Sequence, residues 1–329
     1  MHRKPEIGKP PSFLAEECDI SLGTASFFKR CIDAVRNNKA YALGSFVEYC
    51  DIFKTNLERF RFSCGAEAVD ESILKNIESF IPYRNEVVEL FTTVARYSLT
   101  HDFLLVIHHF FEGLLPYMER PSNVSTWNEN DFDNYKFIIQ ELFLYTVALL
   151  VQNEKFDEIN YLFQQRYYVN SRRGYGKTST VSFDFFWQYI ESFENINRKK
   201  DKRRLSVRSD LLKERCTGVG VHFQSLMQAD FIVFLRAEID HKDDDHNWYP
   251  DTLLYSQIEN IYGAFEIFAR SISKSYFDRV KILLQIDSPA DLAPLLQSYK
   301  DRSRQLPRWE RYGFSPSSLL GFSELATLP

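Results

Sequence analysis

The sequence predicts an all-α protein, in which an irregular stack of antiparallel helical hairpins, similar to an α-solenoid, is followed by a smaller helical domain. Apolar residues recur at three- and four-residue steps through most of the 329 residues, which is the period of an amphipathic helix. Glycine and proline are scarce, with 12 of each, whereas turn-rich sandwiches, barrels and propellers need more. Short polar stretches separate the apolar runs, as they do in helical hairpins.

The first half of the chain contains the clearest helical patterns. Pro82 opens one of them, because proline is favoured in the first turn of a helix. The polar stretch 152–155 leads into a run that begins at Phe156, and this predicts a helix folded back on the preceding one. We expect the earlier helices over 39–62, from Asp70, from Pro82, over 101–118 and over 135–151.

A basic, turn-rich region divides the chain. We expect an N-terminal hairpin array over 1–170, a connecting region with one helix over 171–207, and a C-terminal helical domain with an extended tail over 208–329. The helix of the connecting region is predicted at 183–196. Ser288 is a favoured N-cap before Pro289. The C-terminal helices are predicted over 221–238, 252–271, 273–285 and 289–299.

Charge and cysteine content limit the function classes. The formal charge of -5 and the isoelectric point near 5.9 give no global attraction to nucleic acid or to anionic membranes. Apolar stretches such as 142–151 are shorter than the roughly 18 residues that a spanning helix needs. The five cysteines are far apart and form no C-x-x-C motif. We therefore expect a cytoplasmic protein with free thiols, without a membrane span and without a cofactor.

Basic residues concentrate on both sides of the predicted helix at 183–196. The stretch 170–180 only partly matches a phosphate-binding loop, because Ser171 stands in place of the first glycine. The run 198–215 could neutralise phosphates, and its alternative is a solvated linker. Aromatic side chains are enriched where surfaces meet partners. We expect partner or nucleic-acid contacts from Arg172, Arg173, Lys177, Arg198, Lys199, Lys200, Lys202, Arg203, Arg204, Trp248 and Tyr249.

Two groups of histidines were considered as metal ligands. The loop from His241 to His246 contains five side chains that can bind a metal. Consecutive ligands on one loop rarely converge without distant ligands, so no metal site is predicted there. His108 and His109 are neighbours on a predicted helix and point to different faces, which prevents joint chelation.

The segment Arg236-Ala-Glu-Ile-Asp-His241 has the Arg-x4-His spacing of HEPN ribonucleases, which it resembles. The resemblance implies metal-independent cleavage of RNA, with Arg236 holding phosphate and His241 acting as acid or base. Position 237 is Ala, where that family has a polar residue. The same Arg-x4-His spacing also occurs from Arg96 to His101.

Three segments of the C-terminal third are similar to the helical C-terminal region of uncharacterised bacterial multidomain proteins associated with antiviral defence: Leu226 to Arg236, Trp248 to Tyr255, and Phe265 to Arg270. The resemblance implies a sensor, regulator or assembly region and assigns no catalytic residue. The sequence thus predicts a helical scaffold, regulatory or sensor subunit that binds another protein. The alternatives are a HEPN-like RNA endonuclease and non-catalytic nucleic-acid binding through 198–215.

Overall fold

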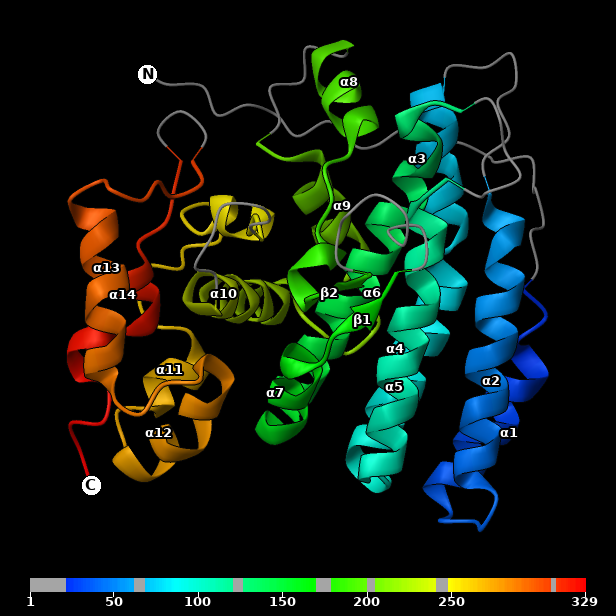
Figure 1. Cartoon of the computed structure of the whole chain (residues 1–329), viewed down its shortest axis with the longest axis horizontal. Helices are drawn as coiled ribbons and strands as arrows, with labels where there is room; N and C mark the ends of the chain where they lie inside the picture. The colour runs from blue at the N-terminus through cyan, green and yellow to red at the C-terminus, as the bar shows by residue number, and fades with distance from the viewer. Residues whose placement is uncertain are drawn as a thin grey trace, which may run out of the picture.

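The computed structural model describes seven stretches of the chain: residues 22–61, 69–120, 127–169, 179–199, 205–240, 248–308 and 312–329. These residues form fourteen α-helices, several 3-10 turns and one two-stranded sheet. The predicted all-α class is confirmed (Figure 1). The solenoid-like arrangement of the hairpins stays a prediction.

The N-terminal helices lie side by side (Figure 1). Helix α1 packs against α2 and α4, α2 packs against α5, and α4 packs against α6. Short 3-10 turns extend α2 over Leu57–Phe60 and α5 over Leu115–Met118, and another precedes α6 at Glu129–Phe132. The helices are α1 (Ala25–Arg36), α2 (Ala42–Asn56), α3 (Val69–Ser79), α4 (Ile81–Tyr97), α5 (His101–Leu114) and α6 (Asp133–Gln152).

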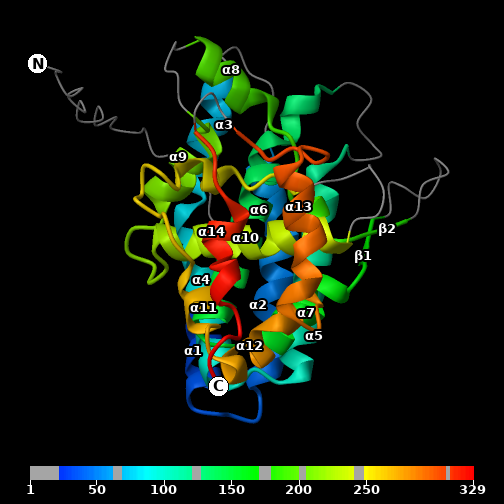
Figure 2. The same cartoon turned by 90° about the vertical axis from the view of Figure 1, so that its left-hand side faces the viewer.

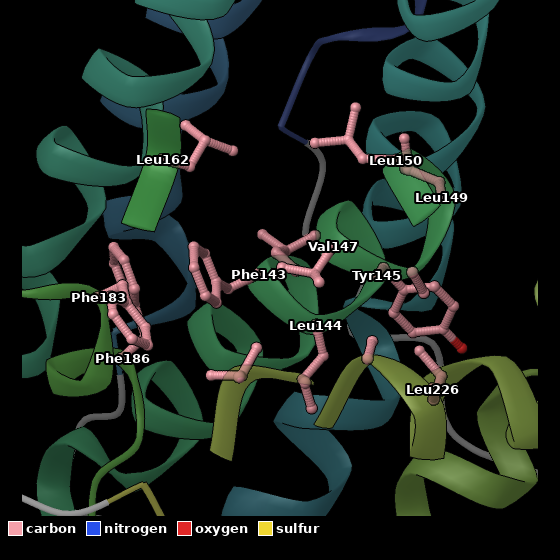
Figure 3. Close-up of a cluster of buried hydrophobic side chains, with 14 of the residues drawn as sticks. Phe143, Leu144, Tyr145, Val147, Leu149, Leu150, Leu162, Phe183, Phe186 and Leu226 are labelled. Atoms are coloured by element: carbon pink, nitrogen blue, oxygen red, sulfur yellow. The ribbon is translucent and has the colours of Figure 1, made fainter. Parts of the chain in front are cut away.

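Helix α6 is the central element of the core. Residues 130–152 are long and apolar enough to cross a membrane, but 94% of an apolar 18-residue stretch within them is buried in the fold, as in the core helix of a packed protein. Figure 3 shows Phe143 beside Phe183 and Phe186, with Tyr145 on another side of the helix. The rings of Phe143 and Phe186 are stacked, with centroids 4.5 Å apart. Helix α6 is therefore enclosed on nearly all sides.

The middle of the chain folds back on α6. Helix α7 (Phe156–Gln164) packs against α6, which confirms the predicted hairpin. Strands β1 (Tyr167–Tyr168) and β2 (Thr180–Val181) then form an antiparallel pair. They are followed by a 3-10 turn at Phe183–Phe186 and by α8 (Glu191–Lys199).

The predicted continuous helix at 183–196 is wrong. Trp187 has an extended backbone, with φ -87° and ψ 124°, which separates the 3-10 turn from α8. Long-range bonds hold this break: the Trp187 Nε1 donates to Asp251 Oδ2, and the Gln188 carbonyl accepts from Arg208. Tertiary hydrogen bonds here override a helical hydrophobic pattern.

The C-terminal helices cover one side of the molecule, in front of the N-terminal helices in Figure 2. The predicted helix at 252–271 is wrong, because a 3-10 turn, η6 (Asp251–Tyr255), is followed by a reversal at Asn260, whose φ is 58°. A capping box at Ser288 opens the predicted 289–299 element. The helices are α9 (Val207–Arg215), α10 (Phe223–Asp240), α11 (Glu266–Arg270), α12 (Lys274–Val280), α13 (Ala293–Lys300) and α14 (Pro316–Leu320).

Apolar packing continues across the predicted connecting region. One cluster of buried side chains extends from Leu22 to Leu325, and α10 packs directly against α6. The tail is packed against the body, because Leu319, Leu320 and Leu325 are buried and Leu328 bridges to Ser273. Within the described residues, the two halves share one core.

A buried ion triplet fastens α9 to this core. Glu141 of α6 accepts two hydrogen bonds from the Arg215 guanidinium, both at 2.7 Å. The Arg84 Nη1 of α4 lies 3.3 Å from Glu141 Oε1 and donates to the Tyr145 hydroxyl at 2.7 Å. All three charged side chains are buried. The triplet joins three helices that are far apart in the sequence.

Candidate interaction surface

Aromatic side chains from two distant segments meet where residues 187–190 pass η6. The rings of Trp187 and Tyr249 are 5.8 Å apart between centroids and inclined by 33°, and both side chains are only half-buried. Tyr189 follows two residues after Trp187 and is 55% exposed. These rings form an aromatic patch of the kind found in protein interfaces.

Helix α8 borders the aromatic patch. The helix begins at Glu191, directly after the segment that carries Trp187 and Tyr189, and the carboxylate of Glu194 acts electrostatically on the Tyr249 phenol. Arg198 lies four residues further on, on the same helix face, and is exposed. We call Trp187, Tyr189, Glu194, Arg198 and Tyr249 the α8 surface. Burial, together with the charges of Asp251 and Glu194, raises the pKa of Tyr249 to about 12, so the phenol is neutral at physiological pH.

The ring pair rests on Asp251 and Arg208. Asp251 accepts hydrogen bonds from the Trp187 Nε1 at 2.9 Å and from the Ser206 hydroxyl at 3.0 Å. The Arg208 Nε lies 3.4 Å from Asp251 Oδ2, and its guanidinium carbon lies 5.2 Å from the centre of the Trp187 ring. Arg208 therefore contacts the indole through a cation–π interaction and pairs with the carboxylate that accepts the indole N–H. The arrangement fixes the orientation of Trp187.

A fully buried carboxyl group, that of Asp230, lies in α10 and binds the residues on both sides of Tyr249 and Asp251. Asp230 of α10 accepts from the Trp248 Nε1 at 2.6 Å, from the Thr252 hydroxyl at 2.6 Å and from the Thr252 N–H at 3.1 Å. Burial raises the pKa of Asp230 to about 7, although these donors oppose the shift. Trp248 was expected at a partner surface and is instead 2% exposed. Its indole bonds to Asp230 and so anchors the chain just before η6 to α10, which is why Trp248 is buried and does not face a partner.

The basic residues of 198–215 divide into two groups. Arg208 and Arg215 are buried, and Lys213 pairs with Glu259 at 2.5 Å, so these three support the fold instead of offering free charge to phosphates. Arg198 is exposed in the last turn of α8, and Lys199 ends that helix. The other expected contact residues lie outside the described residues: Arg172, Arg173, Lys177, Lys200, Lys202, Arg203 and Arg204.

The role expected for Arg236 in a HEPN-like nuclease is wrong. Its side chain is 1% exposed, and its Nε donates to Asp240 Oδ2 at 2.6 Å. Its Nη1 donates to Asn160 Oδ1 at 2.9 Å and to the Leu283 carbonyl at 3.0 Å. A guanidinium enclosed by three protein acceptors cannot reach the phosphate of an RNA strand. His241, the other expected catalytic residue, lies outside the described residues.

Sequence reasoning missed the supporting residues of the α8 surface. Trp187 was placed inside a helix, Asp251 was given no role, and Arg208 was counted among the basic residues of 198–215 that could neutralise phosphates. The bond between Trp187 and Asp251 joins residues 64 positions apart. A local pattern carries no signal for such a pair, so only the folded chain identifies it.

The sequence matches no family model, and comparison with curated proteins and with solved structures finds no significant match. In the part of the chain that the structure describes, no group of three or more His, Cys, Asp or Glu side chains is arranged to hold a metal ion.

Proposed function

We propose that the chain is a helical scaffold or regulatory subunit that binds another protein through the α8 surface. The observation that supports this is the tilted ring pair of Trp187 and Tyr249, which is half-exposed at the surface, with the indole held by Asp251 and Arg208. Tryptophan, tyrosine and arginine are the residues enriched at binding hot spots. Rings that are already fixed lose little conformational entropy when a partner covers them.

The cellular setting is part of the same proposal. The resemblance of the C-terminal third supports a place in a bacterial antiviral defence assembly, with the chain as a sensor or assembly subunit. Cys31, Cys50 and Cys216 are buried free thiols, which supports a reducing compartment such as the cytoplasm. Burial raises the pKa of Cys31 to about 12 and that of Cys216 to about 11, so neither is suited to act as a nucleophile.

Non-catalytic nucleic-acid binding is the second candidate function. Arg198 is exposed at the end of α8, where the basic run begins, and it lies one helical turn after Glu194, whose charge acts on the Tyr249 phenol. An unpaired base could stack on Trp187 and Tyr249 while basic residues neutralise its phosphates. The salt dependence of binding separates this function from the first.

Site-specific photo-crosslinking in the native host tests the proposal. A photoreactive amino acid is placed at Tyr189 in one variant and, as a matched control, at Tyr97 in another, because the two tyrosines are 55% and 60% exposed. We expect one partner polypeptide to crosslink at position 189 and not at 97. The purified partner should then bind Tyr189→Ala at least roughly tenfold more weakly than the wild type, which is 1.4 kcal/mol.

Two results would contradict protein binding through this surface. One is equal crosslinking at positions 189 and 97, and the other is unchanged affinity of the partner for Tyr189→Ala. Crosslinked material that a nuclease removes, with an affinity that falls linearly with the logarithm of salt concentration, would instead establish nucleic-acid binding.

A further inference from the structure

Two arginines hold one carboxylate on the side of the molecule where the C-terminal helices meet α7. Arg270 Nη2 lies 2.7 Å from Glu154 Oε1, and Arg279 Nη1 lies 2.8 Å from Glu154 Oε2. Each guanidinium therefore takes a different oxygen of the same group. The two hydrogen-bonded guanidinium groups lower the pKa of Glu154, which keeps the carboxylate ionised.

Aromatic rings hold the two arginines independently of Glu154. The guanidinium carbon of Arg270 lies 4.2 Å from the centre of the Tyr276 ring. That of Arg279 lies 5.7 Å from the same ring and 5.4 Å from the ring of Phe156. Cation–π contacts of this kind orient a guanidinium without a counter-charge. The two cations would therefore remain close together if the carboxylate left.

The carboxylate lies on the short turn that ends α6, where the backbone N–H groups of Glu154 and Lys155 donate to Val151 and Leu150, and the site is open to solvent. Glu154 lies between α6 and α7 and has a left-handed backbone, with φ 53°, which is unusual for a residue other than glycine. About half of each arginine side chain is exposed, 48% for Arg270 and 52% for Arg279, and Glu154 is 30% exposed. A ligand from solution can thus reach the position that the carboxylate occupies.

We propose that Arg270 and Arg279 form a clamp for a phosphate monoester and that Glu154 is its built-in competitor. A phosphate monoester carries more negative charge than a carboxylate and offers three acceptor oxygens in place of two. Guanidinium groups match phosphate oxygens in pairs. The negative charge of Glu266 also acts on Arg270 and opposes the binding of any anion, so the preference for phosphate comes from its greater attraction to the two guanidinium groups.

Binding at the clamp has a conformational consequence. Glu154 ties the turn between α6 and α7 to α11 and α12 through its two arginines. A phosphate that replaces the carboxylate releases this turn from the C-terminal helices. The clamp is separate from the α8 surface, and its ligand is independent of the proposed function.

Isothermal titration calorimetry with inorganic phosphate, and separately with O-phosphoserine, tests the clamp. The variant Glu154→Gln keeps the shape of the side chain but removes its charge. The matched control is Glu48→Gln, because Glu48 pairs with the single cation Arg30, at 3.1 Å. We expect Glu154→Gln to bind phosphate at least roughly tenfold more tightly than the wild type, as the loss of an intramolecular competitor predicts. Glu48→Gln should behave as the wild type.

The double variant Glu154→Gln/Arg279→Gln should lose the gained affinity, while its thermal melting temperature confirms that it is folded. Tighter binding of O-phosphoserine than of inorganic phosphate would identify a partner-borne phosphoryl group, and equal binding would identify free phosphate. The proposal is overturned if Glu154→Gln binds both probes no more tightly than the wild type, or if the gained affinity survives the loss of Arg279.

Discussion

Replacing Glu141 by glutamine tests whether the buried ion triplet holds the two halves of the chain together. The variant keeps the volume of the side chain but leaves the guanidinium groups of Arg84 and Arg215 buried without a counter-charge. Arg215 makes two 2.7 Å hydrogen bonds to Glu141, and Arg84 Nη1 lies 3.3 Å from it. Breaking a buried pair costs about 3–5 kcal/mol. Because two cations lose one anion, we expect the upper part of this range, about 4–5 kcal/mol.

Such a loss is large compared with the total stability of a folded domain, roughly 5–15 kcal/mol. Equilibrium unfolding in urea measures it. With an m-value of about 3 kcal/mol per molar, the midpoint should fall by more than about 1 M. The control variant Glu89→Gln removes an exposed pair with Arg36, whose atoms are 3.1 Å apart, and should cost less than about 1 kcal/mol.

An apolar triplet provides a second check on the same reasoning. Replacing Glu141, Arg84 and Arg215 together by leucine and methionine removes all three buried charges, and such replacements are often neutral or stabilising. We expect the triple variant to be more stable than Glu141→Gln alone. If the free energy of unfolding of Glu141→Gln lies within about 1 kcal/mol of the wild-type value, the buried triplet does not hold the two halves of the chain together.

Three further predictions concern single buried groups. The Asp230 pKa is raised from 3.8 to about 7, so between these pH values the folded state holds a proton that the unfolded state has released. The free energy of unfolding should therefore fall by about 2–4 kcal/mol as the pH rises through this range. Urea unfolding at pH 5 and pH 8 should show a smaller fall for Asp230→Asn than for the wild type. Arg236→Met should lower the unfolding free energy by about 1–3 kcal/mol, because its acceptors lose their donor, and an unchanged thermal melting temperature would contradict the burial. Cys31, Cys50 and Cys216 should react with a thiol reagent only at the rate of unfolding, and rapid labelling of any of them in native buffer would show that it is accessible.

Helical periodicity predicted those elements whose apolar residues face a neighbouring helix. In α2, Phe46, Phe53 and Tyr49 recur at helical spacing, and all three are buried. The same rule failed at 183–196, where Phe183, Phe186 and Ile190 also recur at three- and four-residue steps. There the chain buries its apolar side chains without forming a continuous helix, because the Trp187 indole N–H and the Gln188 carbonyl form hydrogen bonds with the distant residues Asp251 and Arg208.

The site was less accessible to sequence reasoning than the fold. Tyr249 and Arg198 were expected to face a partner, and both belong to the α8 surface. Trp248 was assigned the same kind of role, and Arg236 was expected to hold phosphate in the alternative nuclease, but both are buried. An arginine or a tryptophan has the same appearance in a sequence whether it binds a partner or fills a core. Burial decides between these roles, and it depends on contacts between residues far apart in the chain.

Helix α9 connects the buried core to the proposed interaction surface. Arg208 in its first turn supports Trp187, and Arg215 in its last turn is held by Glu141 of α6. The two arginines are seven residues apart and therefore lie on the same side of the helix. A partner that binds the ring pair thus contacts side chains supported by α9, and the other end of this helix is fixed by the buried triplet. The rigidity of the α8 surface follows from that anchor, which is why the stability of the core and the affinity of the surface should fall together when Glu141 is changed.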